Sequence, residues 1–79
     1  MITINVKYFG MITETIGKSS EQLKIEVIDG VNLKVFFENK YPQLKKMDYK
    51  IAINQQLTDI LNEALNNVEV ALLPPFAGG

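Results

Sequence analysis

The sequence contains no cysteine and no histidine. Disulfides and metal sites built on sulfur or nitrogen ligands are therefore excluded, and no acidic loop has the spacing of a calcium site, so we expect no bound metal. Histidine is also the most frequent general base and the usual activator of a serine nucleophile. Ser19 and Ser20 lack that partner. Few side chains remain that could carry out catalysis.

Arginine is absent too, so the positive charge comes from eight lysines, which nine acidic residues balance to a net charge of −1. The lysines are dispersed, and we interpret the pair Lys45-Lys46 as part of a solvated loop. A nucleic-acid surface normally needs clustered cations. No apolar run approaches the roughly 20 residues of a membrane span, and no basic segment precedes an apolar one at the start. We expect no nucleic acid, no membrane and a cytoplasmic location.

Hydrophobic residues, in contrast, make up 47% of the 79 residues, which is enough for one small core. Alternation of apolar and polar residues predicts strands at 2–8, 22–28, 49–53 and 68–72. In the third, Tyr49, Ile51 and Ile53 are expected on one face and Lys50 and Ala52 on the other. A turn is expected at Asn66-Asn67 before the last strand, because asparagine tolerates a positive φ.

Helical spacing appears in two segments. Residues 11–17 predict a short helix that Gly17 closes in a left-handed conformation. Residues 33–41 predict the main helix, capped by Asn32 or Asp29 and ended by Pro42. We expect an irregular connection over 43–48, while 57–65 is compatible with a helical turn or with a loop containing a brief strand.

These elements predict an α+β roll in which a mixed sheet packs on one main helix. The first two strands are close enough in the sequence to pair antiparallel. The last strand carries a run of aliphatic residues typical of a buried position, so we expect it in the centre of the sheet, parallel to the first strand. Residues 1–73 would form this domain, and 74–79 an extended, flexible carboxyl tail.

The tail reads Pro74-Pro75-Phe76-Ala77-Gly78-Gly79. The two prolines end the ladder of hydrogen bonds and force an extended exit. Glycines without Cβ atoms can pass a constriction that excludes other residues, and the α-carboxylate of the last one is ionised at neutral pH. That carboxylate can attack an activated phosphate of ATP to give an acyl-adenylate. A frayed end with Phe76 folded onto the core is the plainer interpretation.

The same residues resemble the MoaD-type sulfur carriers, the small subunits of molybdopterin synthase in the ubiquitin-like β-grasp superfamily. The resemblance covers essentially the whole chain, through Tyr8-Phe9-Gly10, Lys40-Tyr41-Pro42, Ile53-Asn54-Gln55 and the ending Leu72 to Gly79. Two features depart from the family pattern. Asn67-Val68 stands where a Gly-Asp turn is usual, and the main helix carries adjacent phenylalanines, Phe36 and Phe37.

The resemblance implies a β-grasp fold and a mechanism centred on Gly79. An activating enzyme would use ATP to adenylate its carboxyl group, and sulfur would replace the adenylate to leave a thiocarboxylate. The large subunit of molybdopterin synthase, in a heterotetramer, would receive the tail through Pro74, Pro75, Phe76, Ala77 and Gly78. There the sulfur would pass to cyclic pyranopterin monophosphate in molybdenum cofactor biosynthesis. The chain would bind no permanent cofactor and would be a non-catalytic, sulfur-donating subunit of a transferase.

Three alternatives remain open at this point. The chain could carry sulfur for thiamine or for tRNA thiolation, although Pro74-Pro75 favours the molybdenum pathway. It could be a ubiquitin-like modifier joined through Gly79 to lysines of other proteins. It could also be an interaction domain whose tail has no role. For a carrier, we expect an apolar docking patch on the last strand or its neighbours.

Overall fold

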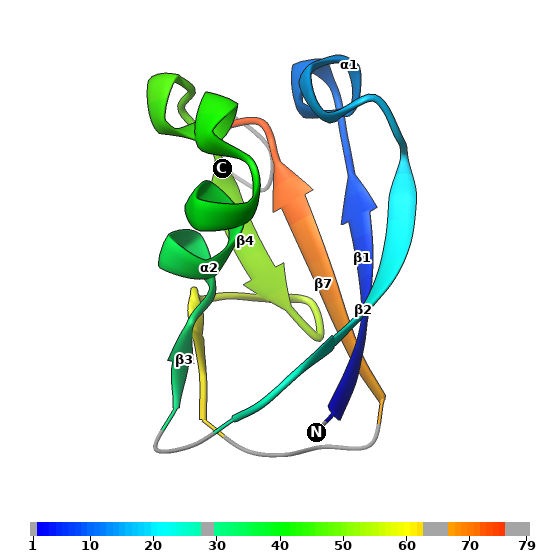
Figure 1. Cartoon of the computed structure of the whole chain (residues 1–79), viewed down its shortest axis with the longest axis vertical. Helices are drawn as coiled ribbons and strands as arrows, with labels where there is room; N and C mark the ends of the chain where they lie inside the picture. The colour runs from blue at the N-terminus through cyan, green and yellow to red at the C-terminus, as the bar shows by residue number, and fades with distance from the viewer. Residues whose placement is uncertain (1, 28–29, 63–66, 76–79) are drawn as a thin grey trace.

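The computed structural model describes residues 2–27, 30–62 and 67–75 and shows a five-stranded mixed sheet with one main helix on its inner face (Figure 1). The sheet order is β2-β1-β7-β4-β5. Its strands are β1 (Ile2–Tyr8), β2 (Ser20–Ile25), β4 (Lys50–Ile53), β5 (Gln56–Leu57) and β7 (Asn67–Leu73). Strands β3 (Val31–Asn32) and β6 (Ile60–Leu61) pair separately. The helices are α1 (Met11–Ile16), α2 (Leu33–Lys40) and the 3-10 helix η1 (Pro42–Lys46).

Strand β7 occupies the centre of the sheet, parallel to β1 and antiparallel to β4, which confirms the predicted position. Its alternate residues Val68, Val70 and Leu72 are at most 1% exposed. Strand β1 pairs with residues 67–72 of β7 and β4 with residues 70–73, so the carboxyl-terminal half of β7 is hydrogen-bonded on both edges. The carboxyl tail therefore leaves the domain from its most firmly held strand.

Strands β1 and β2 pair antiparallel as predicted, with Ile2 opposite Ile25 and Lys7 opposite Ser20. Helix α1 lies in the connection between them and ends at Gly17, whose φ of 88° is the expected left-handed cap. Strand β2 begins and ends earlier than the predicted 22–28, because its pairing follows the register of β1. Of that predicted segment, Ile28 lies outside the described residues.

Helix α2 begins where the side chain of Asn32 accepts a hydrogen bond from the backbone N–H of Val35 at 3.2 Å, so Asn32 is the cap. Asp29, the other cap considered, lies outside the described residues. Leu33 and Phe37 on its inner face are fully buried. The helix ends before Pro42, as predicted, because proline removes a backbone donor.

The connection after α2 is not irregular, contrary to the prediction. Pro42 begins the 3-10 helix η1, since its fixed φ suits a first helical position, and the fully buried Leu44 anchors the segment to the core. The backbone N–H of Met47 closes it by donating to the carbonyl of Leu44 at 3.0 Å. Burial of Leu44 thus orders a helix whose other side chains are mostly polar.

The undecided segment from 57 onward is a loop with brief strands rather than a helical turn, over the part that the structure describes. Asn54 and Gln55 both have positive φ, 50° and 71°, and they make the tight turn from β4 to β5. Leu61, which is 3% exposed, fixes β6 in the core. The predicted Asn66-Asn67 turn lies partly outside the described residues, and Asn67 begins β7.

The core lies between α2 and the inner face of the sheet, which positions the two ends of β7 rigidly. Its buried side chains come from strands β1, β2, β4, β6 and β7, from helices α1 and α2, and from η1. Ala52, expected on the solvated face of its strand, is only 7% exposed, so β4 is covered on both faces at that point. An alanine is small enough for neighbouring side chains on the outer face to shield it.

Candidate functional site

The predicted site is the carboxyl tail, and the structure describes its first two residues. Pro74 is half-buried and Pro75 is exposed, directly after β7. Phe76, Ala77, Gly78 and Gly79 lie outside the described residues. The last contact of the parallel pair is a hydrogen bond of 3.2 Å from the backbone N–H of Phe9 to the carbonyl of Leu72. The start of the tail is therefore fixed against the end of β1.

Gly10 packs against Pro74 where the tail begins. It has a φ of 60°, in a region that favours glycine, and a Cβ atom added to it would lie 3.0 Å from Cγ of Pro74. Helix α1 supports the turn, because Thr13 donates its hydroxyl to the carbonyl of Tyr8 at 2.7 Å. In the sequence, Gly10 stands out only as part of the segment Tyr8-Phe9-Gly10. Its contact with Pro74 joins two distant parts of the sequence, which no local pattern reveals.

An apolar groove of about 440 Å³ opens beside the base of the tail. Its lining residues come from the start of α1, the end of η1 and the tail itself: Gly10, Met11, Ile12, Met47, Asp48, Pro74 and Pro75. Met11 is 70% exposed, although it is a large hydrophobic residue. Figure 1 shows α1 and η1 at the same end of the molecule as the tip of β7. Sequence analysis did not identify Met11 or Met47, because only the fold brings them together.

A second group of apolar side chains lies on the outer face of the sheet, opposite α2, where Lys7 pairs with Ala71 and Lys50 with Leu73. Leu57 on β5 pairs with Ala52, which pairs with Ala71 on β7, so the three side chains share that face. Phe9 follows Tyr8, the partner of Leu72, and so lies beside Leu73 on the same face. Leu57 and Phe9 are 55% and 42% exposed. This outer-face stripe, defined as Phe9, Ala52, Leu57, Ala71 and Leu73, reaches the base of the tail.

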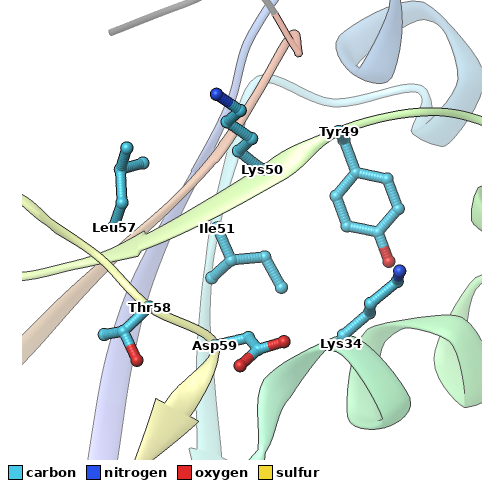
Figure 2. Close-up of a pocket in the computed structure, with 7 residues that line it drawn as sticks. All are labelled: Lys34, Tyr49, Lys50, Ile51, Leu57, Thr58 and Asp59. Carbon is cyan, nitrogen blue, oxygen red and sulfur yellow. The ribbon is translucent and has the colours of Figure 1, made fainter. Parts of the chain in front are cut away.

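A separate pocket of about 380 Å³ is lined by charged and apolar residues of α2, β4 and the β5–β6 connection (Figure 2). In Figure 2, Lys34 and Tyr49 point toward each other, while Lys50 extends away. The ammonium of Lys34 lies 6.0 Å from the centre of the Tyr49 ring, and the Tyr49 hydroxyl donates to Glu38 at 2.7 Å. Burial and the Glu38 carboxylate raise the pKa of Tyr49. Interactions within the chain thus engage the polar groups of Lys34 and Tyr49.

A partly buried polar cluster joins the ends of β1 and α2 to the start of β2. The hydroxyls of Tyr8 and Tyr41 both donate to the carboxylate of Glu21, which also forms an ion pair of 3.4 Å with Lys18. Burial, and then the bond to Glu21, raise the pKa of both tyrosines. Burial alone would raise the pKa of Glu21, but the two hydroxyls and Lys18 outweigh it and lower that pKa. The cluster is polar yet satisfied within the chain.

Residues 2–27, 30–62 and 67–75 contain no group of three or more acidic side chains that could hold a metal ion. Within the same ranges, no helix has the length and apolar character needed to cross a membrane.

Comparison with known proteins identifies relatives that the chain matches from end to end. No protein-family model matches the chain. The molybdopterin synthase sulfur carrier subunit of Mycobacterium tuberculosis is 32% identical over 84 aligned positions, which cover 100% of both chains. The sulfur carrier subunit of molybdopterin synthase from Caenorhabditis elegans is 29% identical, again over 100% of both.

Solved structures show the same fold. The putative molybdopterin converting factor subunit 1 of Pyrococcus furiosus superposes with a TM-score of 0.73 at 20% identity, covering 95% of this chain and 99% of that one. Small archaeal modifier protein 1 of Methanosarcina acetivorans gives 0.67 at 26%, covering 100% and 98%. The complex of subunits 1 and 2 of the molybdopterin-converting factor from Helicobacter pylori contains a chain with a TM-score of 0.63 at 28%, covering 99% and 100%. The mixed sheet on one helix is the ubiquitin-like β-grasp fold, as predicted.

Proposed function

We propose that Gly79 carries sulfur as a C-terminal thiocarboxylate, because this chain belongs to the family of molybdopterin synthase sulfur carrier subunits. The carboxylate of Gly79 attacks the α-phosphate of ATP and releases pyrophosphate, so that an acyl-adenylate forms. A sulfide-level donor then displaces AMP and leaves the thiocarboxylate. The thiocarboxylate sulfur bonds to a carbon of cyclic pyranopterin monophosphate in place of an oxygen group, and water then hydrolyses the acyl–sulfur bond, which leaves the sulfur on the pterin and restores the carboxylate of Gly79. ATP is a substrate of the activating enzyme and not a resident cofactor of this chain.

The observation that supports this proposal best is the way β7 presents the tail. The strand is buried at the centre of the sheet and ends against Phe9 and Gly10, so Pro74 starts from a fixed position. Pro75 continues as an exposed residue. A carrier needs this combination, because the domain must be held by one surface while its reactive end reaches into another protein. The chain has no histidine, the most frequent general base, and no cysteine.

The partner that fits is the large subunit of molybdopterin synthase, because a related chain is found in a complex of subunits 1 and 2 in Helicobacter pylori. We assign its docking surface to the outer-face stripe. Exposed aromatic and aliphatic side chains, here Phe9 and Leu57, are typical anchors at the centre of protein interfaces. Two carriers and two large subunits would form the heterotetramer. The activating enzyme, a second partner, would meet the same tail in the cytoplasm.

Intact-mass measurement tests the proposal directly. The chain is incubated with an activating enzyme, ATP and a sulfide-level donor, with ATP omitted as the control. We expect the mass to rise by the difference between sulfur and oxygen only when ATP is present. Fragmentation should place the change on Gly79. An unchanged mass with an activating enzyme that thiolates a related carrier would overturn the proposal.

The modifier alternative retains one supporting observation, which is the structural likeness to small archaeal modifier protein 1 at 26% identity. A modifier would form an amide bond between Gly79 and a lysine of another protein. Because Lys50 is the last lysine of the chain and arginine is absent, tryptic peptides that carry residues 51–79 on a lysine, recovered from cells, would support conjugation. Their absence together with a thiocarboxylate on the free chain would support the carrier.

A further inference from the structure

We propose that the groove at the base of the tail receives an apolar side chain of the large subunit, and that Asp48 at its edge pairs with a lysine or arginine next to that side chain. The groove is the one between α1, η1 and the two prolines. This inference rests on the proposed function, since it names a second contact made by the protein that holds the tail.

The tail brings any such partner to the groove. Pro74 and Pro75 belong to the groove wall, and the segment that must be enclosed begins at the next residue. Four residues, 76–79, span at most about 14 Å when fully extended. A protein that surrounds Gly79 and grips the tail along its length must therefore lie against Pro75. The groove is then covered by the same protein, whether or not it also contacts the outer-face stripe.

The residues that line the groove are almost all apolar, so they favour binding of an apolar side chain. Ile12 forms a rigid floor at 2% exposure, and Met47 is half-buried beside it. Met11 is 70% exposed, and a long, unbranched thioether side chain can adapt its shape to an aromatic or aliphatic group. Two prolines complete the wall without offering a backbone N–H. A polar side chain would find almost no hydrogen-bond partner inside the groove.

The negative charge of Asp48 at the edge of the groove favours a positively charged partner residue next to the inserted apolar side chain. Asp48 is the one ionisable residue among those that line the groove. Among the residues that the structure describes, one ion pair is present, between Lys18 and Glu21. Within that part of the chain, the Asp48 carboxylate therefore forms no ion pair with a lysine. Lys45 and Lys46 precede it on η1 but do not line the groove. A cation beside the inserted apolar side chain would complement this carboxylate.

Titration of the large subunit with single variants tests both parts. Met11→Ser removes the adaptable wall at an exposed site, and Asp48→Lys reverses the charge. We expect the dissociation constant to rise about tenfold for Met11→Ser. For Asp48→Lys we expect a comparable rise that shrinks as salt is added, because screening weakens the interaction between exposed charges. Val35→Ser is the matched control, since Val35 is 56% exposed on α2 and does not line the groove, and it should bind unchanged.

Two results separate this inference from the proposed function. If Met11→Ser and Asp48→Lys bind the large subunit like the unmodified chain, while the chain still acquires and donates sulfur, the groove inference is wrong and the function stands. If the unmodified chain never acquires sulfur, the function itself fails. Thermal unfolding of each variant checks that a loss of binding does not come from a loss of folding.

The other possible occupants give distinct results in the free chain. If the groove held Phe76 of the same chain, the methyl NMR signals of Met11 and Met47 would shift strongly on Phe76→Ala. If it held a second copy, the free chain would dimerise with rising concentration and Met11→Ser would abolish the dimer. Either result would overturn the assignment to the large subunit. Unshifted methyl signals in a monomer, which then move when the large subunit is added, would support it.

Discussion

Tyr8 and Phe9 are neighbours in the sequence, yet the Tyr8 side chain lies in the core and the Phe9 side chain is partly exposed. The Tyr8 ring packs edge-on against Phe37, with ring centres 6.4 Å apart, and its hydroxyl donates to Glu21. Phe9 is 42% exposed in the outer-face stripe. On the Tyr8 side, apolar and polar groups find their partners within the chain. On the Phe9 side, the apolar side chains of Phe9 and Leu57 remain largely exposed.

This difference separates stability from function. Residues on the inner side should determine the free energy of unfolding and affect sulfur transfer only through folding. Residues on the outer side and in the tail should affect binding and transfer while leaving the melting temperature unchanged. Gly10 lies where the two sides meet, because it joins the end of β1 to Pro74. Each prediction below tests whether the separation holds.

Deletion of Gly79 should have the largest effect, and only on function. Sulfur transfer should be abolished, because the shortened tail places its carboxyl group one residue short of the reaction centre. Addition of one alanine after Gly79 should do the same. Single-turnover transfer to cyclic pyranopterin monophosphate and a thermal melt measure the two quantities. A variant with full transfer activity would contradict the proposed role of Gly79.

Phe37→Ala should have the largest effect on the inner side. The ring is fully buried and contacts both Tyr8 and Phe36, so its removal leaves a cavity that the core cannot fill. The free energy of unfolding should fall by about 3–5 kcal/mol. Urea denaturation measures this loss. At a temperature where the variant is still folded, its affinity for the large subunit should be unchanged, and a large loss there would break the separation.

The strands and the main helix could be predicted because their signals are local. Val68, Val70 and Leu72 alternate within one strand, and Asn32 lies at the start of a helical pattern that Pro42 ends. The 3-10 helix after Pro42 was missed because a single buried leucine, Leu44, holds it through contacts with distant residues. The early boundaries of β2 were missed for a similar reason, since pairing with β1 sets them.

The candidate site divides in the same way. The tail could be recognised because its residues are contiguous and their order is informative, and its assignment remains a prediction over 76–79. The groove could not be found, because Met11 and Met47 become neighbours only after α1 and η1 have folded over the end of β7. The outer-face stripe was expected on the last strand or its neighbours, but Leu57 lay in a segment whose structure the sequence left undecided.

Phe9→Ser should have a smaller effect, on the outer side. The side chain is partly exposed, so its replacement should change the melting temperature little, while the contact area with the large subunit is lost. The dissociation constant should rise about tenfold, which corresponds to roughly 1.4 kcal/mol. Calorimetric titration measures it, with Lys24→Ser on the exposed face of β2 as the control. Equal effects of the two substitutions would show that the stripe is not a docking surface.

Glu21→Gln should have the smallest effect, and a pH dependence that identifies its origin. Glu21 accepts hydrogen bonds from Tyr8 and Tyr41, and its pKa in the folded chain lies below its ordinary value. The ionised carboxylate therefore stabilises the fold at pH values above the ordinary glutamate pKa. This contribution disappears as the pH falls through the lowered pKa, because the protonated side chain resembles glutamine. At pH 7 the substitution should cost about 0.5–1 kcal/mol, because glutamine keeps an acceptor oxygen for the tyrosine hydroxyls.

Urea denaturation of the two chains from pH 7 down into the acid range measures this difference. The curves should converge on acidification, since only the unmodified chain loses the carboxylate. A difference that stays constant with pH would mean that packing, and not ionisation, sets the contribution of Glu21. Binding to the large subunit at pH 7 should be the same for both chains, because the cluster lies on the Tyr8 side. A change in affinity would show instead that the two sides are coupled through β1, and that stability and docking cannot be altered independently in this fold.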